Sequence, residues 1–165
     1  MLIKFFLGVL IVAFTSFCGH LLAKKYRKRM LFFQQFYTFN ERFLSEIAYY
    51  RRPIKEFISL HSYEGEFGCF LSEIFTEKEE NLPISGMFEK SDEYTFLKEE
   101  DRKTISDYFS MLGKGDSASQ KGYFSSIKER LLSLRKEAEA DAKRYGDLYV
   151  KIGFLCGLLI LILIV

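Results

Sequence analysis

Apolar side chains form long uninterrupted runs at the two ends of the chain. Residues 5–23 contain no Asp, Glu, Lys or Arg, and residues 152–165 contain none either. As helices, these runs would be about 28 and 21 Å long at about 1.5 Å per residue, against a hydrocarbon core of about 30 Å. The pattern predicts one transmembrane helix over residues 1–23 and a second, short one over residues 151–165.

Between the two runs, apolar residues recur at intervals of three and four, which is typical of helices that bury one face. Helices are predicted from Phe36, after Pro53, over Phe67–Phe75 and over Lys98–Leu112. The segment "ENLPISG", residues 80–86, is predicted to be a loop. No segment alternates as a half-buried strand does, so the predicted fold class is all-α.

The last predicted helix has the most regular pattern in the chain. Its apolar stripe consists of Phe124, Ile127, Leu131, Leu134, Ala138, Asp141, Tyr145, Leu148 and Ile152, with one acidic residue in the series. Such a stripe is typical of a packed helix seam. Because it continues into the C-terminal apolar run, the sequence predicts a helical bundle over residues 24–150 whose last helix enters the membrane without a break.

The distribution of charge predicts an orientation for this arrangement. Residues 24–29 hold five basic side chains, and Lys143, Arg144 and Lys151 precede the second apolar run. Positively charged flanks remain in the cytoplasm, so the bundle between the two anchors is expected to be cytoplasmic. Residues 30–165 contain 24 − 6 = 18 basic and 22 acidic side chains, a net charge of −4, which argues against a nucleic-acid partner.

The stretch "LGKGDSASQ", residues 112–120, contains a Gly-Lys pair and small polar residues, as phosphate-binding loops do. The motif G-x-x-x-x-G-K-[ST] would place its first glycine at Tyr108 and its Ser or Thr at Gly115. Neither position matches, and the preceding segment is predicted to be a helix instead of the strand that the motif requires. The sequence therefore favours a corner between two helices.

The corner interpretation gives several of these residues a structural role. Gly113 is expected just beyond a helix end with positive φ. Ser117 and Gln120 fit a capping box, with Asp116 as a competing cap. Lys114 lies between two glycines and has no structural role in such a corner, so we expect it to contact a partner.

Residues suited to catalysis or to metal binding do not cluster in the sequence. The cysteines and histidines are scattered at Cys18, Cys69, Cys156, His20 and His61. No Ser, His and Asp stand at a recognisable spacing. The sequence predicts no catalytic, metal-binding or cofactor-binding residue, no cofactor and no enzymatic activity.

Both long helices should leave the same membrane face and run antiparallel. If Lys24 lies level with Lys151, paired residue numbers sum to about 175. Phe43 would then contact Leu131 or Leu132. Glu46 is expected to be partly buried, with Arg130 or Lys128 as its partner, and removing only that partner would be costly.

Gly153 and Gly157 form a G-x-x-x-G pattern that permits close helix approach. The sequence leaves open whether the glycines pack on the first anchor, on a second copy of the chain in a homo-oligomer, or on a partner protein. Packing on the first anchor is favoured.

Three stretches carry a resemblance to a known family: "FLSEIAYYRRPIKEF" (43–57), "LGKGDSASQ" (112–120) and "YGDLYVKIGFLCGLLILILIV" (145–165). With the N-terminal anchor and its basic flank, they resemble the stage III sporulation protein AB family of endospore-forming bacteria. The positions of the family's motifs are occupied by Glu46, Pro53, Leu112, Gly113, Asp116, Gln120, Tyr145, Gly146, Tyr149, Gly153 and Gly157. Arg52 stands where the family usually has Thr or another small residue, and residues 59–96 lie outside the resemblance.

The resemblance implies a component of the transenvelope complex that connects mother cell and forespore. It implies a two-pass protein of the mother cell's outer forespore membrane, with a domain similar to the cytoplasmic domains of type II secretion and type IV pilus platform proteins. The implied partners are a cytosolic ATPase similar to stage III sporulation protein AA, other membrane proteins of the complex and the lipid bilayer.

The expected function is therefore a non-enzymatic membrane platform. A helix from Ser117 to Lys151 would be about 50 Å long at about 1.5 Å per residue, which would put the 112–120 corner within reach of a cytosolic ATPase. A membrane-anchored helical signal transducer or adaptor is the main alternative. A small membrane-bound hydrolase is a third.

Overall fold

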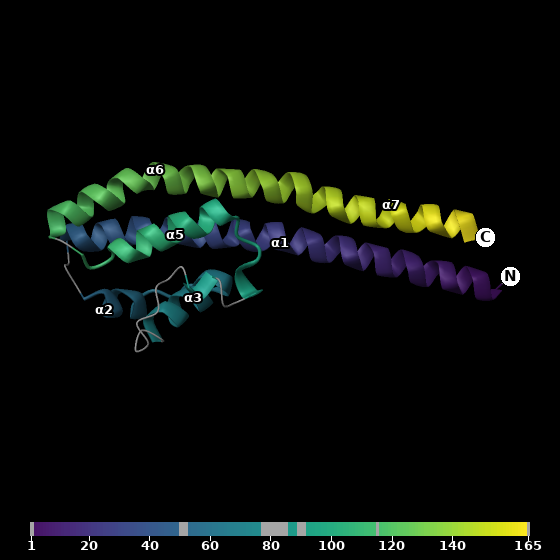
Figure 1. The fold of residues 1–165 in the computed structure, drawn as a ribbon, viewed down its shortest axis with the longest axis horizontal. Coiled ribbons are helices and arrows are strands. Elements are labelled where there is room, and N and C mark those ends of the chain that lie inside the picture. The colour runs from purple at the N-terminus through teal and green to yellow at the C-terminus, as the bar shows by residue number, and fades with distance from the viewer. Residues whose placement is uncertain (1, 50–52, 77–85, 89–91, 115, 165) are drawn as a thin grey trace. The chain divides into compact units, whose positions relative to one another are not determined.

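The computed structural model describes residues 2–49, 53–76, 86–88, 92–114 and 116–164. Its main elements, in chain order, are α1 (Leu2–Tyr49), α2 (Ile54–Ser59), α3 (Gly65–Thr76), the 3₁₀ turn η1 (Asp92–Tyr94), α5 (Glu99–Met111), α6 (Ser117–Asp141), the π-helical turn η2 (Ala142–Gly146) and α7 (Asp147–Ile164) (Figure 1). No strand occurs in these described ranges, which confirms the all-α fold class.

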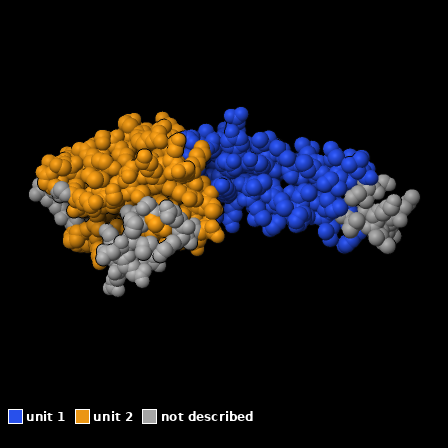
Figure 2. All heavy atoms as spheres, in the orientation of Figure 1, with its two compact units in different colours: residues 1–30, 137–165 blue, residues 31–136 orange. Residues whose placement is uncertain are grey.

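The chain forms two compact units (Figure 2). Unit 1 comprises Met1–Met30 and Glu137–Val165, and unit 2 comprises Leu31–Lys136. Helices α1 and α6 contribute residues to both units, because the unit boundaries fall inside them.

Unit 1 is an antiparallel pair of helical segments. The N-terminal part of α1 lies beside η2 and α7, and the two chain termini lie at the same end of the pair (Figure 1). Both segments contain stretches long and apolar enough to cross a membrane, and only 11% and 6% of the residues in those stretches are buried. Exposed apolar surface of this extent fits helices that lie in a lipid bilayer.

Unit 2 is built around phenylalanine and tyrosine rings. The ring of Phe36 is fully buried, with its centroid 5.6 Å from that of Phe67 in α3 and 4.8 Å from that of Tyr108 in α5. Phe39 contacts Phe57 of α2 at 5.5 Å between centroids. These contacts make α1 the central helix of the unit, because its rings meet those of α2, α3 and α5.

The predicted helices of unit 2 are confirmed. Helix α5 occupies the predicted range within one residue at each end, and α3 contains the predicted Phe67–Phe75 segment. Pro53 directly precedes α2 with φ −57°, the angle that the proline ring favours, and its carbonyl accepts the first helical hydrogen bond from the amide of Phe57. The predicted loop at residues 80–86 lies outside the described residues except for Gly86.

The last helix remains helical from α6 through α7, but its buried stripe does not follow the predicted period. Leu148 and Ile152 were predicted on the packed face, yet they are 43% and 44% exposed. Tyr149 and Gly153 contact α1 in their place. The reason is the π-helical turn η2, which holds more residues per turn than an α-helix and so delays the packed stripe by one residue.

The predicted antiparallel register is also wrong. In unit 2, the Nδ2 of Asn40 lies 3.3 Å from the carbonyl oxygen of Phe124, a pair whose numbers sum to 40 + 124 = 164. Phe43 meets Phe124, with ring centroids 5.0 Å apart, whereas the predicted register placed it level with Leu131 or Leu132. Close contacts between side chains set this register, whereas the predicted sum of 175 assumed that lysines at the two membrane flanks lie at equal depth.

The corrected register separates Glu46 from its predicted partners. Glu46 is 6% exposed, so its predicted burial is confirmed. The Asn40–Phe124 and Phe43–Phe124 contacts give sums of 164 and 43 + 124 = 167, which place Glu46 level with about residue 120. That is some 15 Å from Arg130 along the helix axis at about 1.5 Å per residue. Lys128 Nζ instead lies 3.1 Å from Glu41 Oε1, and Arg130 Nη2 lies 4.0 Å from Glu100 Oε2.

Candidate functional site

Glycines bring the two helical segments of unit 1 into close contact. A Cβ atom added to Gly153 would lie 2.6 Å from the carbonyl oxygen of Thr15, and one added to Gly157 would lie 2.8 Å from the Cα of Val12. Gly19 of α1 faces the backbone of Tyr149 in the same way. The G-x-x-x-G pattern therefore packs on the first anchor, the pairing that the sequence favours, and the absence of side chains lets the two backbones approach.

Three tyrosines extend the contact between the two helical segments of unit 1, at the end of the unit that lies away from the chain termini. The ring of Tyr26 lies 5.3 Å from that of Tyr145 and 5.8 Å from that of Tyr149, measured between centroids. A hydrogen bond with Tyr149 and, to a lesser extent, burial raise the pKa of the Tyr26 hydroxyl. Tyrosines are enriched where a membrane helix meets water, so this cluster fits the edge of a bilayer.

A buried arginine lies one turn further along α1. The side chain of Arg29 is 3% exposed, and its Nη1 donates to Asp141 Oδ2 at 3.0 Å while its Nη2 donates to Glu137 Oε1 at 3.2 Å. Asp141 is the acidic residue that interrupts the predicted apolar stripe, and its role is to neutralise this guanidinium. The sequence contains both charges, but the predicted register does not bring them together.

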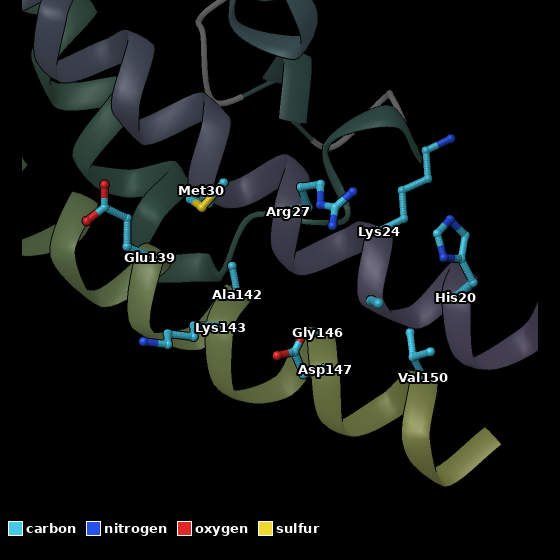
Figure 3. Close-up of a pocket in the computed structure, with 11 residues that line it drawn as sticks. His20, Lys24, Arg27, Met30, Glu139, Ala142, Lys143, Gly146, Asp147 and Val150 are labelled. Carbon is cyan, nitrogen blue, oxygen red and sulfur yellow. The ribbon is translucent and has the colours of Figure 1, made fainter. Parts of the chain in front are cut away.

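The π-helical turn η2 follows Asp141 directly, and a pocket of about 310 Å³ opens beside it (Figure 3). Its walls come from α1 on one side and from α6, η2 and α7 on the other. Gly146 of the motif lines this pocket, and a Cβ added there would meet no atom within 4 Å. Turns of π-helix are frequent at functional sites, which makes the pocket a candidate binding site.

The pocket combines apolar walls with a charged rim. Ala23 and Val150 supply apolar surface, whereas Lys24, Arg27 and Lys143 supply positive charge. These three cationic side chains are exposed, and they form no ion pair with any residue in the described ranges. Such a rim attracts an anion, and the apolar walls favour a ligand with a hydrocarbon portion.

In unit 2, the predicted helix corner is confirmed. Helix α5 ends at Met111, and Gly113 has φ +77°, a conformation that glycine adopts without steric cost. The amide of Lys114 donates to the carbonyl oxygen of Met111 at 3.2 Å, and the Lys114 side chain is exposed. A helix precedes the corner where a phosphate-binding loop would have a strand.

The cap of α6 differs from the predicted capping box. Asp116 is the cap, because its Oδ1 accepts the amide of Ser119 at 3.1 Å, whereas Ser117 is the first residue of the helix. Gln120 Nε2 donates to the carbonyl oxygen of Lys114 at 3.2 Å instead of reaching the amide of Ser117. Hydrogen bonds from the side chain and the amide of Ser119 hold the pKa of the Asp116 carboxyl below its usual range.

Asn40 is a buried polar residue that the sequence analysis missed. It is fully buried, and besides donating to the carbonyl of Phe124 it accepts the hydroxyl of Tyr108 at 3.0 Å. Burial raises the pKa of Tyr108 well above its usual value, so this hydroxyl is a permanent donor. One asparagine thus joins α1, α5 and α6. In the sequence, the only sign of this buried polar contact is that a single asparagine stands among aromatic residues at helical spacing.

The structure does not gather the predicted residues into one site. Unit 1 contains Tyr145, Gly146, Tyr149, Gly153 and Gly157, whereas unit 2 contains Glu46, Pro53, Leu112, Gly113, Lys114, Asp116, Ser117, Gln120 and Arg130. Leu112 is the half-buried C-cap of α5. Within the described part of the chain, no group of three or more His, Cys, Asp or Glu could hold a metal ion.

Comparison with known proteins adds one finding. A family model described as stage III sporulation protein AB matches residues 4–165. The search of curated proteins and the search of solved structures gave no match. This family description implies a sporulation-related role, and the two exposed apolar helices of this chain fit a membrane protein. Because the match covers essentially the whole chain, the protein belongs to the stage III sporulation protein AB family.

Proposed function

We propose that the protein is a non-enzymatic membrane platform in the channel complex that links mother cell and forespore. Unit 1 anchors it in the outer forespore membrane of the mother cell, and unit 2 lies in the mother-cell cytoplasm beside a secretion-type ATPase similar to stage III sporulation protein AA. The family match over residues 4–165 is the observation that carries this proposal.

The packing of unit 1 supports the anchoring part of the proposal. Its two apolar segments expose most of their side chains, as lipid-facing helices do, and hold each other through Gly19, Gly153 and Gly157. Small-residue contacts are the usual means of helix association in lipid, where burial of apolar surface gives little driving force.

The α5–α6 corner supports the ATPase contact. The backbone amide of Lys114 donates to the carbonyl oxygen of Met111 and its carbonyl oxygen accepts from Gln120 Nε2, while its side chain is exposed. An exposed charge whose backbone is held by hydrogen bonds is well suited to electrostatic recognition, which chiefly governs the association rate and the salt dependence.

A pull-down of the purified full-length protein with the AA-type ATPase tests this contact. Lys114→Glu is expected to weaken binding by about tenfold at near-physiological salt, as the inversion of a recognised charge does. Lys121→Glu is the matched control, because Lys121 is an exposed lysine in the first turns of α6. Equal binding by Lys114→Glu and the unmodified protein would show that the corner has only a structural role.

Deletion of the gene tests the proposed role in the cell. Loss of the platform is expected to block sporulation after engulfment and to leave vegetative growth unchanged. Normal spore yield in a clean deletion would contradict the proposal. A reporter inserted near Gly86 should report a cytoplasmic location, and reporters at the two termini should report the opposite side of the membrane.

A further inference from the structure

The pocket beside η2 has a combination of surfaces that the platform role does not explain. It is formed by two helices whose apolar segments begin a few residues away, and it is lined by Ala23, Met30 and Val150 as well as by charged groups (Figure 3). The tyrosine cluster of Tyr26, Tyr145 and Tyr149 lies on the same stretch of the helix pair. These observations place the pocket where a membrane helix pair meets the headgroup layer.

The charges around the pocket are not balanced. The residues that line it include three cationic side chains, Lys24, Arg27 and Lys143, and two carboxylates, those of Glu139 and Asp147, which leaves a formal surplus of 3 − 2 = +1. Arg29, which lies nearby on α1, differs from these three cations because it is paired with carboxylates. Its guanidinium is buried and its charge is balanced by the carboxylates of Glu137 and Asp141. The cations of the rim are exposed and have no such partner among the described residues.

The π-helical turn forms part of the pocket wall through Ala142, Lys143 and Gly146. A π-helical turn contains one more residue than an α-helical turn. The residues after η2 therefore lie on a different side of the helix than they would in an uninterrupted α-helix. Gly146 leaves its part of the pocket wall without a side chain. There is room for one, because a Cβ atom at this position would meet no atom within 4 Å. The glycine is thus not required for close packing, in contrast to Gly153, and its effect is to leave the pocket wide.

We propose that this pocket binds the phosphate headgroup of an anionic phospholipid at the membrane surface. The ammonium and guanidinium groups of the rim contact the phosphate, and the apolar wall contacts the glycerol and the first methylene groups of the acyl chains. Basic pockets between membrane helices on the cytoplasmic side are suited to anionic headgroups. The inference rests on the membrane placement of unit 1 and is independent of ATPase binding.

The test uses the full-length protein in phosphatidylcholine nanodiscs that contain a small fraction of spin-labelled lipid. Electron paramagnetic resonance then gives the fraction of immobilised label, first with phosphatidylglycerol and then with phosphatidylcholine as the zwitterionic reference. The unmodified protein is expected to immobilise phosphatidylglycerol preferentially. The preference should weaken as salt is raised, because screening reduces the attraction of exposed charges.

Two matched double variants separate the pocket from the general charge of the membrane flank. Lys24→Gln/Lys143→Gln removes two lysines that line the pocket, and Lys25→Gln/Lys151→Gln removes two exposed lysines that do not. We expect the pocket variant to lose preference by about fivefold for each lysine removed, and the control to stay within about twofold. Equal losses in both variants, or no loss in the first, would overturn the proposal.

A third variant tests the shape of the pocket without changing its charge. Gly146→Leu introduces a side chain into the open space, and it is expected to reduce lipid preference while unchanged helical circular dichroism shows that the fold is intact. Retained preference in a folded Gly146→Leu protein would contradict the pocket. Inorganic phosphate in excess should not displace the lipid. Displacement would identify a soluble phosphate as the ligand and overturn the lipid assignment.

Discussion

The two units hold their helices together by opposite means. In unit 1, α1 and α7 approach through positions without side chains, such as Gly19 and Gly153. In unit 2, α1 meets its neighbours through some of the largest side chains available, with Phe36 and Phe39 fully buried. The same helix α1 takes part in both arrangements, so the difference does not come from the type of secondary structure.

The solvent explains the difference. In water, each buried phenylalanine stabilises the fold by removing apolar surface from the solvent, at roughly 25 cal/mol per Å². In lipid that gain disappears, and helices associate through close van der Waals contact, which glycines permit. The comparison therefore supports a bilayer around unit 1 and water around unit 2. Exchanging large and small residues in each unit tests this difference most directly, and changes to single polar contacts of unit 2 sharpen it.

The largest effect is expected from a deletion in the aromatic core. Phe36→Ala should lower the free energy of unfolding by about 3–5 kcal/mol, since it leaves a cavity among the rings of Phe67, Tyr108 and Phe109. The thermal midpoint of the full-length protein, followed by circular dichroism in nanodiscs, measures the loss. Leu31→Ala, at a position 50% exposed in the same helix, is the control and should change little.

The next effect comes from the opposite change in unit 1. Gly153→Leu should cost about 3 kcal/mol and separate the helix pair, because its Cβ would clash with the backbone of Thr15. Spin labels at Phe6 and Ile162, both exposed, report the separation by double electron–electron resonance after the three cysteines are replaced by serine. Gly122→Leu is the control, because a Cβ at Gly122 meets no atom within 4 Å. An unchanged distance distribution in Gly153→Leu would show that glycine contacts do not hold unit 1.

A smaller effect is expected at the buried polar contact of unit 2. Asn40→Leu leaves the Tyr108 hydroxyl buried without its acceptor and should cost about 2 kcal/mol. Tyr108→Phe in the same chain removes the unpaired hydroxyl, so the double variant is expected to recover part of the loss. Additive losses in a double-mutant cycle of thermal stability would show that the two side chains are not coupled.

The smallest effect is a pH dependence at the α6 cap. The pKa of Asp116 is lowered in the folded state, so its contribution to stability is present at neutral pH and is lost as the pH falls through that lowered value. Asp116→Asn can still cap the helix but does not titrate. The thermal midpoints of the two proteins should therefore differ more at pH 7 than in acid below the lowered pKa of Asp116, where its carboxyl is protonated. A constant difference would exclude this cap as a titrating group.

Local features of the fold could be predicted from the sequence. Periodic apolar residues located α3, α5 and α6, and the Gly113 turn was identified from its glycine and the polar residues that follow it. These features depend on hydrogen bonds and steric limits within a few residues of the chain. The residues that carry them are adjacent in the sequence, so their pattern can be recognised without a structure.

The sites themselves depended on contacts between distant segments. In the sequence, Arg29 is the last residue of a basic cluster, and Asp141 is the acidic residue in the apolar stripe of the last helix. The predicted register did not bring these two side chains together. The proposed lipid pocket could not be predicted, because it depends on the observed register of the two helices and on the wider turn at Ala142–Gly146.

The sequence by itself thus determined an all-helical protein with two apolar ends, a glycine corner and the motifs of its family. Only the tertiary structure decided which residues of α1 face which residues of α6 and α7. The physical reason is that register is set by a sum of small packing terms across the helix pair, from the Gly19–Gly153 approach to the Phe43–Phe124 contact. One additional residue in a π-helical turn then moves every later side chain to a different face without changing the apolar composition of the helix.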